Sequence, residues 1–305
     1  MLGILAMPVF SRAQSGGVSV SPVKFEISAN PGETQTSFFK VTNNGDSERV
    51  IRIAVEDFAP VGESGQVRLV EDAPSTYALS QWVTFDPIEF PLGAKETKQI
   101  EFRINVPFDA EPGGHYASIL ATVGGGAVEG GAAIAQKVGS LLLLHVAGDV
   151  EEEMFVKSMQ SVIENPEKKD EYLPQNFFEY GPVTVLSRFE NMGTVHLKPR
   201  GFVTLTNMMG REVDKVEIEQ LNVLPNSVRR IPAELGEKWM FGKYTATMTA
   251  IYGSTNEPLS YSTSFWVFPW KVGGAVGFGV LIFLLFMFKA RKRIRLAFKV
   301  LFKGN

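Results

Sequence analysis

The sequence predicts an all-β protein, with two tandem Ig-like β-sandwich domains followed by one C-terminal transmembrane helix. Two observations predict the sandwiches. Apolar and polar residues alternate with period two along much of the chain, and turn sequences separate these segments at short intervals. A third observation predicts the helix, because residues 272–288 form an apolar run without a charge close to the C-terminus.

The N-terminal residues 1–13 (MLGILAMPVFSRA) are predicted to be a secretory signal peptide. They hold a short apolar stretch and then small residues at Ser11 and Ala13, which suits cleavage after Ala13. The basic residues that usually open such a signal are missing, which leaves open that its start is truncated. The alternative is an irregular first strand.

Residues 14–149 are predicted to form the first sandwich. In residues 98–106, Ile100, Phe102, Ile104 and Val106 alternate with polar residues. One face of such a strand packs against the core and the other contacts water. The same alternation occurs in two other segments, with Val23, Phe25 and Ile27 in one and Ile51, Ile53 and Val55 in the other.

Residues 150–267 are predicted to form the second sandwich, because they repeat features of the first. Residues 38–45 (FFKVTNNG) resemble residues 186–193 (LSRFENMG), each a strand that leads into a turn with Asn and Gly. Residues 113–123 and 241–252 are both strands that start near a Gly and carry an inward Tyr. Strands followed by such turns are common in all β-sandwiches, so these similarities leave open whether one domain arose by duplication of the other.

Residues 268–288 are predicted to span a membrane once, and residues 289–305 to form a basic cytoplasmic tail. The 17 residues 272–288 reach about 25 Å at the rise of an α-helix, and aromatic flanks supply the rest. The alternative is a buried core helix. The residues predicted to anchor the span at its two ends are Trp266, Trp270, Lys289, Arg291, Lys292, Arg293 and Arg295.

The charge distribution supports a protein with two compartments. The whole chain has a net charge of −3, yet the 17 residues of the tail hold seven basic residues and no acidic one. The part before the tail is therefore acidic, which argues against nucleic acid as a partner. The chain has no Cys, so disulfides and thiol chemistry are excluded.

Motifs for catalysis, cofactor binding or metal binding are not found, and the protein is predicted not to be an enzyme. His115, His145 and His196 lie in separate segments without carboxylates at ligand spacing. Trp82 and Trp239 are expected in the cores, with a sugar-stacking role as the alternative. One glycine-rich segment is either a loose connection or a contact loop, whose candidate residues are Gly124, Gly125, Gly126, Glu129, Gly130 and Gly131.

Several segments resemble the WxL-interacting protein family, a group of DUF916-type cell-surface proteins. These are residues 21–41 (SPVKFEISANPGETQTSFFKV), residues 93–106 followed by Pro112–Ile119, and, in the second half, residues 202–211 and 242–245. The resemblance implies Ig-like domains, a C-terminal membrane anchor, and attachment to the cell envelope. It also implies peptidoglycan or another surface protein as the partner.

The sequence therefore predicts a single-pass protein of the cell membrane, of type I, with its N-terminal region at the cell surface. Its predicted function is adhesion or scaffolding, through binding to cell-wall polymer or another surface protein. The alternative is a membrane-tethered chaperone or assembly factor for surface or pilus subunits. That alternative predicts an unpaired strand edge in the first domain and a basic anchor, for which Arg188, Lys198 and Arg200 are candidates.

Overall fold

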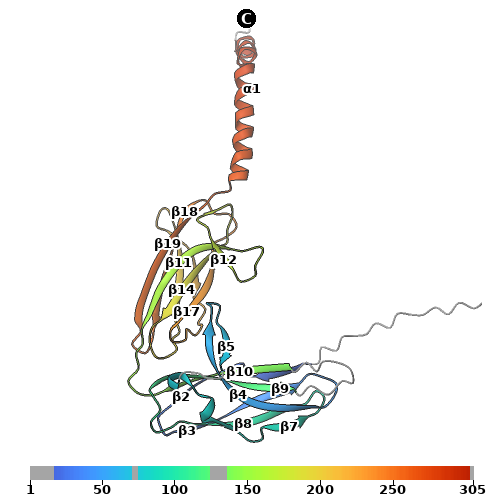
Figure 1. Cartoon of the computed structure of the whole chain (residues 1–305). Coiled ribbons are helices and arrows are strands. Elements are labelled where there is room, and N and C mark those ends of the chain that lie inside the picture. Colours follow the sequence, from blue (N-terminus) through green and yellow to red (C-terminus); the bar gives the residue numbers. More distant parts are fainter. Residues whose placement is uncertain (1–16, 71–74, 124–135, 303–305) are drawn as a thin grey trace, which may run out of the picture. The chain divides into compact units, whose positions relative to one another are not determined.

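The computed structural model describes residues 17–70, 75–123 and 136–302, and it contains four β-sheets and one long C-terminal helix (Figure 1). The chain divides into two compact units. The first contains the residues up to Met154 together with Asn191–Leu197 and Asn222–Arg229, and the second contains the remainder. The predicted domain boundary, between residues 149 and 150, falls in the connection between β10 (Gln136–Val146) and β11 (Met154–Glu164).

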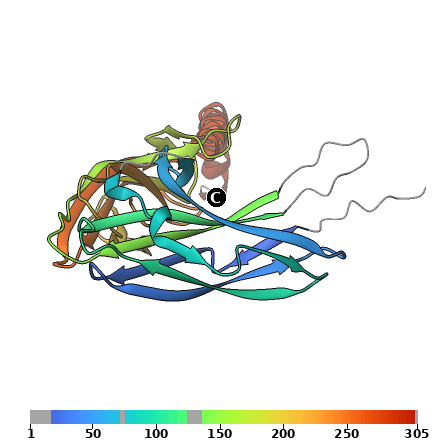
Figure 2. The ribbon, with the colours of Figure 1, turned by 60° about the horizontal axis from the view of Figure 1, so that its bottom comes forward.

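Ten strands and two short 3₁₀-helices precede that connection. They are β1 (Val18–Ser21), β2 (Lys24–Ala29), β3 (Thr34–Asn43), β4 (Arg49–Val61), β5 (Gln66–Val70), η1 (Ser75–Tyr77), η2 (Ser80–Trp82), β6 (Val83–Phe85), β7 (Glu89–Leu92), β8 (Thr97–Asn105), β9 (Gly113–Val123) and β10 (Gln136–Val146). One sheet has the order β1-β3-β8-β6. The other has the order β2-β10-β9-β4-β5, with β7 also paired to β4. Figure 2 shows the two layers of this sandwich.

Nine strands and the helix follow the connection. They are β11 (Met154–Glu164), β12 (Tyr172–Pro174), β13 (Phe177–Phe178), β14 (Val183–Asn191), β15 (Arg200–Asn207), β16 (Glu212–Glu217), β17 (Ser227–Leu235), β18 (Gly242–Tyr252), β19 (Glu257–Val267) and α1 (Trp270–Phe302). The two sheets have the orders β12-β11-β14-β17 and β13-β19-β18-β15-β16. The predicted fold class of two β-sandwiches followed by one helix is confirmed.

The first strand segment changes sheets, and this crossover shapes the sandwich edge. β1 pairs antiparallel with β3, and after Pro22 the chain enters the opposite sheet, where β2 pairs parallel with β10. Val23 lies at the crossover and is 72% exposed, so its predicted place on the inward face is wrong. Phe25 and Ile27, further along β2, do pack against the core.

The period-two alternation explains the core of the first sandwich. In β8, Ile100, Phe102 and Ile104 are almost fully buried, and Ile51 and Ile53 of β4 are buried in the same cluster. Aromatic rings contact one another across the layers, since Phe102 lies 5.1 Å from Phe25, measured between ring centroids. Apolar burial without a disulfide therefore stabilises this sandwich.

The repeated Asn and Gly turn is also confirmed in structure. β3 ends at Asn43 and β14 ends at Asn191, and both side chains are fully buried. Of the two predicted inward tyrosines, Tyr244 of β18 is buried. Tyr116 of β9 is also buried, but it packs in a separate cluster with Phe58 and Leu143, outside the main core of the first sandwich, so its predicted inward place is wrong. The two halves of the chain thus share a buried Asn at the end of a strand, followed by a turn with Gly.

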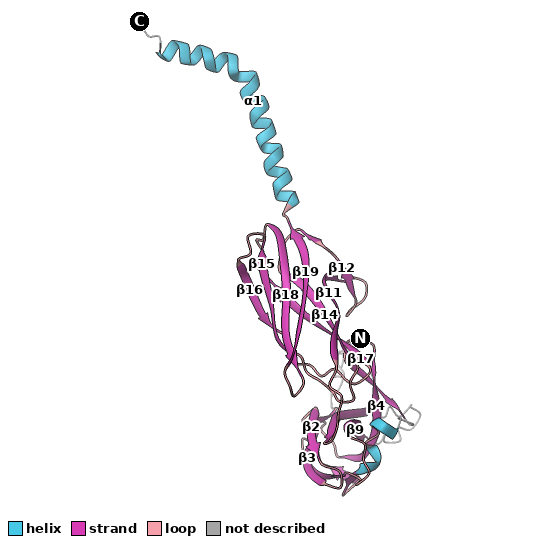
Figure 3. Cartoon of the chain, turned by 90° about the vertical axis from the view of Figure 1, so that its left-hand side faces the viewer, coloured by secondary structure: helices cyan, strands magenta, loops and turns pink. Residues whose placement is uncertain are grey.

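The C-terminal helix differs from the predicted span at both ends. α1 begins at Trp270, because Pro269 and the extended chain after β19 precede it, and it continues to Phe302 through the segment predicted as a separate tail. Figure 3 shows that this helix bends along its length. Its residues Trp270–Arg291 have a mean hydropathy of 2.1, and none of the apolar window is buried by the protein. The helix is thus long and apolar enough to span a membrane.

Candidate functional site

A free strand edge in the first sandwich is the main candidate site. β10 pairs with β9 along its whole length, from Gln136 to Val146. Its other side pairs with β2 only from Leu141 to Val146. Within the described residues, Gln136–Gly139 have no strand partner on that side, and we call this segment the free edge.

The side of β10 to which each backbone N–H and C=O on the free edge points can be inferred from Leu141, the first residue of β10 that pairs with β2. Leu141 donates its backbone N–H to the carbonyl oxygen of Val23, at 3.0 Å, on the side of β2. Backbone groups alternate between the two sides of a strand, so the N–H and C=O of Lys137 and Gly139 point to the same side. Both residues are exposed, and among the described strands none pairs with these main-chain donors and acceptors.

Several contacts hold the free edge in an extended form. Lys137 forms an ion pair with Glu56 of β4, and Ser140 donates its hydroxyl to the carbonyl oxygen of Pro22 at 2.6 Å. Val138 packs against the core of the sandwich. The edge is thus ordered before any partner binds, which lowers the entropy that strand addition would cost.

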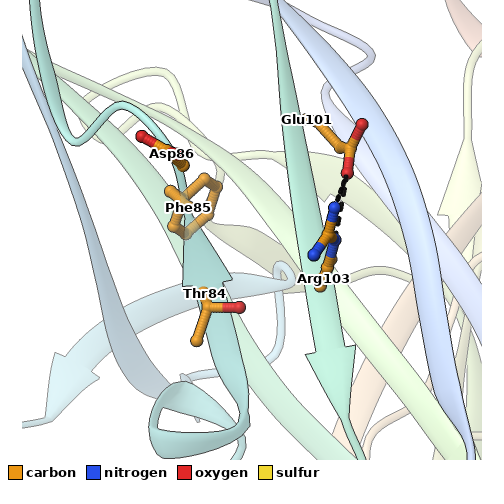
Figure 4. A pocket seen from close by; sticks show the side chains of 5 residues that line it. All are labelled: Thr84, Phe85, Asp86, Glu101 and Arg103. Atoms are coloured by element: carbon orange, nitrogen blue, oxygen red, sulfur yellow. Dashed lines mark hydrogen bonds and ion pairs between the residues drawn. The ribbon is translucent and has the colours of Figure 1, made fainter.

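A small pocket lies on the opposite sheet, beside the edge strand β6 (Figure 4). Its volume is about 360 Å³, and Thr84 and Arg103 face each other across β6 and β8. Arg103 donates to Oε1 of Glu101 through Nε at 3.0 Å and through Nη2 at 2.9 Å. The remaining lining residues are Phe85 and Asp86. The guanidinium of Arg103 is already paired with the carboxylate of Glu101. The pocket therefore offers a ligand only weak polar contacts.

A second pocket, of about 370 Å³, lies beside Trp82. The ring of Trp82 contacts the ring of His115 at 4.4 Å between centroids. His115 is 1% exposed, and its Nδ1 and Nε2 lie 3.1 and 2.9 Å from the carbonyl oxygens of Ala78 and Glu111. His115 thus joins three segments of the sandwich. Groups of His, Asp and Glu suited to a metal ion are not found among the described residues.

The other predicted site residues fall in different places. Trp266 lies in β19 and is half exposed, and Trp270 is the first residue of α1. The basic anchor residues lie in the later part of α1, and the side chains of three of them are outside the described part, namely Lys292, Arg293 and Arg295. The contact-loop residues Gly124, Gly125, Gly126, Glu129, Gly130 and Gly131 are outside the described residues altogether. Their predicted roles stay predictions.

The alternative function predicted an unpaired strand edge in the first domain, but the sequence did not say which strand carries it, because alternation does not reveal which strands pair. The three candidates for the basic anchor lie in different places. Arg188 lies in β14, Lys198 lies just before β15, and Arg200 opens β15 and donates from Nη2 to Asn256 at 3.1 Å. A signal for the crossover was present, since Pro22 separates two short alternating segments and cannot continue a hydrogen-bonded strand.

Comparison with known proteins gives structural matches alone. Neither a family model nor a curated protein matches the chain. The class 5 fimbriae chaperone CfaA is similar in structure, with 11% identity, a TM-score of 0.40, and coverage of 82% of this chain and 99% of CfaA. The Escherichia coli chaperone DraB matches with 13% identity, a TM-score of 0.36, and coverage of 83% and 98%. The PapD-like domain 7 of human CEP192 matches with 14% identity, a TM-score of 0.32, and coverage of 49% and 97%.

The strands of the chain itself show a mostly-β protein with two β-sandwiches and a C-terminal apolar helix. These identities concern the fold alone. Since no family matches, the resemblance to the WxL-interacting protein family stays a prediction.

Proposed function

We propose that this protein is a membrane-tethered assembly factor that holds an extended segment of a partner protein by strand addition to β10. The observation that carries the proposal is the free edge, where Lys137 and Gly139 present unpaired backbone groups. An added strand gains main-chain hydrogen bonds there, independent of the partner's side chains. CfaA is a fimbriae chaperone, but the proposal rests on the edge itself.

The membrane part of the proposal rests on α1. Its segment Trp270–Arg291 is apolar and unburied, and a soluble domain would not leave such a helix uncovered. The basic residues from Lys289 onward, at the end of this segment and beyond it, favour a cytoplasmic C-terminus. In this proposal the two sandwiches lie outside the cytoplasm, at the cell surface or in the envelope, and act by binding.

The adhesion function predicted from the sequence is supported less well. A sugar-stacking role for Trp82 needs an exposed ring face, yet its ring contacts His115 and packs against the core of the first sandwich. Binding to peptidoglycan therefore stays a prediction. The free edge favours a protein partner.

The experiment changes one backbone donor. Replacing Lys137→Pro removes the N–H that faces the free side, and proline is tolerated on an edge strand when its nitrogen points away from the sheet. The matched control, Lys137→Ala, keeps that N–H but removes the ion pair with Glu56. That pair is partly exposed and worth about 0–1 kcal/mol at most.

The readout is capture of the partner in envelopes of the native cell, through a photo-crosslinking residue placed at Lys137, whose side chain is exposed and whose replacement keeps the backbone N–H. The captured protein is then titrated against the purified full chain. Loss of one hydrogen bond costs about 0.5–1.5 kcal/mol, so K137P should weaken binding about 2- to 13-fold, and the proline ring adds to this. K137A should bind nearly as the wild type does. Equal binding by both variants would refute strand addition at β10.

A further inference from the structure

The end of the second sandwich from which α1 leaves carries large apolar side chains that are exposed to solvent. In the turn between β15 and β16, Met208 and Met209 are 58% and 87% exposed. In the connection between β17 and β18, Trp239 and Phe241 are 69% and 65% exposed. We call these four residues the apolar collar.

The strand register places both turns at the same end of the sheet. Gly242, which follows the second turn, pairs with Val267, the last residue before the linker to α1. Asn207, which precedes the first turn's methionines, pairs with Tyr244. Both turns of the collar are therefore beside the point where the chain continues into the helix.

Side-chain contacts connect the collar to that linker. The ring of Phe241 contacts the ring of Phe268, with 5.1 Å between centroids. Trp239 contacts Tyr180 edge to face at 5.5 Å, and Lys238 lies 5.7 Å from the centre of the Trp239 ring. One residue into α1, Nζ of Lys271 forms an ion pair with Glu179 at 2.7 Å.

This composition is unusual for turns of a water-exposed domain. Turns are normally formed by Gly, Pro, Asn, Asp and Ser, and single exposed apolar residues are common but clusters of them mark interaction sites. The neighbouring residue Met240 is 6% exposed and fills the core, so the chain buries one side chain and leaves its two neighbours outside. Aromatic residues and Met beside a Lys suit the boundary between lipid headgroups and acyl chains.

We propose that the apolar collar inserts into the interface of the bilayer that α1 spans. The inference rests on the membrane-spanning role of α1 in the proposed function. The occupant is a lipid bilayer because the collar is continuous, through Phe268, with the start of the span. Contact with lipid would hold the second sandwich against the membrane surface and limit its rotation about the short linker at Phe268–Pro269.

The absence of Cys makes a direct test simple, because each introduced Cys gives one labelling site. The full chain is reconstituted in nanodiscs of phosphatidylcholine and phosphatidylglycerol, and a nitroxide is attached at M209C. The matched control is T255C, in the exposed turn between β18 and β19 at the other end of the same strands. A third label, L284C, reports on the span itself.

The measurement is the collision rate of each nitroxide with oxygen, which concentrates in lipid, and with a water-soluble nickel chelate. The label at residue 209 should be more accessible to oxygen than to nickel, as should the label at 284, whereas the label at 255 should show the reverse. If 284 reports lipid and 209 behaves like 255, the collar proposal is overturned and the span stands. If 284 also reports water, both the span and the collar are overturned.

Discussion

Removal of one buried amide, by Asn43→Ala, is expected to destabilise the first sandwich strongly. The side chain of Asn43 is fully buried at the end of β3. Its Nδ2 donates to the carbonyl oxygens of Ser47 at 2.8 Å, Gly93 at 2.9 Å and Leu92 at 3.1 Å. Its Oδ1 accepts the N–H of Gly45 at 2.9 Å. One side chain thus fastens the turn after β3 to the segment after β7.

Asn191 has the same role at the end of β14, which makes it an independent second test. Its Nδ2 donates to the carbonyl oxygens of Val195 and Val223, both at 2.8 Å, and its Oδ1 accepts the N–H of Gly193 at 2.9 Å. It too is fully buried. Asn191→Ala should therefore produce an effect of similar size in a different part of the chain.

The expected loss of stability can be estimated from the number of hydrogen bonds that each variant removes. Nδ2 has two hydrogens, which in Asn43 are shared among three carbonyl oxygens, so we count two donated bonds for each side chain and one accepted from the glycine two residues further on. At about 1 kcal/mol for each buried hydrogen bond, the loss is about 3 kcal/mol for either variant. Alanine also leaves backbone groups buried without partners. This loss is a large fraction of the usual 5–15 kcal/mol stability of a domain.

The assay is urea unfolding of the full chain in detergent, followed by hydrogen exchange with mass spectrometry so that the regions are read separately. N43A should lower the protection of β3 and β8, and N191A that of β11 and β14. The control is Asn44→Ala, because Asn44 makes one exposed side-chain bond, to Ser19 Oγ at 3.0 Å. If N43A costs no more than N44A, the buried amide is not what fixes this turn.

Two further predictions concern other parts of the sandwiches. Gly201→Ala should destabilise the second sandwich by about 1–3 kcal/mol or more, because its Cβ would lie 2.1 Å from the carbonyl oxygen of Thr249 and 2.6 Å from Cα of Ala250; an unchanged thermal midpoint would contradict this. Hydrogen bonds from the backbone N–H and the side chain of Asn30 lower the pKa of Glu33 below its ordinary value of 4.5. Because the folded-state pKa is the lower one, this stabilisation is present above the unfolded-state pKa and is lost as the pH falls through the folded-state pKa. The stability difference between wild type and E33Q, measured from pH 7 to pH 3, should shrink as the pH falls below the unfolded-state pKa, and a constant difference would argue against the hydrogen bonds as its cause.

The sequence predicted those features that depend on local pattern. The alternation in residues 98–106 predicted β8 and its buried face, because the apolar side chains of a strand lie on the face that packs against the core. The helix was found from composition, although its start at Trp270 depends on the preceding Pro269. The prediction that Val23 faces the core was wrong, because period-two alternation holds only within one strand and the chain changes sheets at this residue.

The candidate sites depend on contacts between distant segments, and these were not predictable in the same way. The free edge exists because β2 covers only part of β10, which is a matter of register between residues far apart in the chain. The collar also needed the structure, because Trp239, Met240 and Phe241 are equally apolar in sequence. Only the packing shows that Met240 points inward while its neighbours are exposed.

The parallel pairing of β2 with β10 has a consequence for the order of events during synthesis. Lys24 pairs with Leu141, so one of the first strands to be made must wait for one of the last strands of its sandwich. Such non-local pairing slows folding, because a long loop must close before the contact is gained. The first sandwich can therefore close only after nearly half the chain exists, and until then β2 is itself an unpaired strand that needs protection from aggregation.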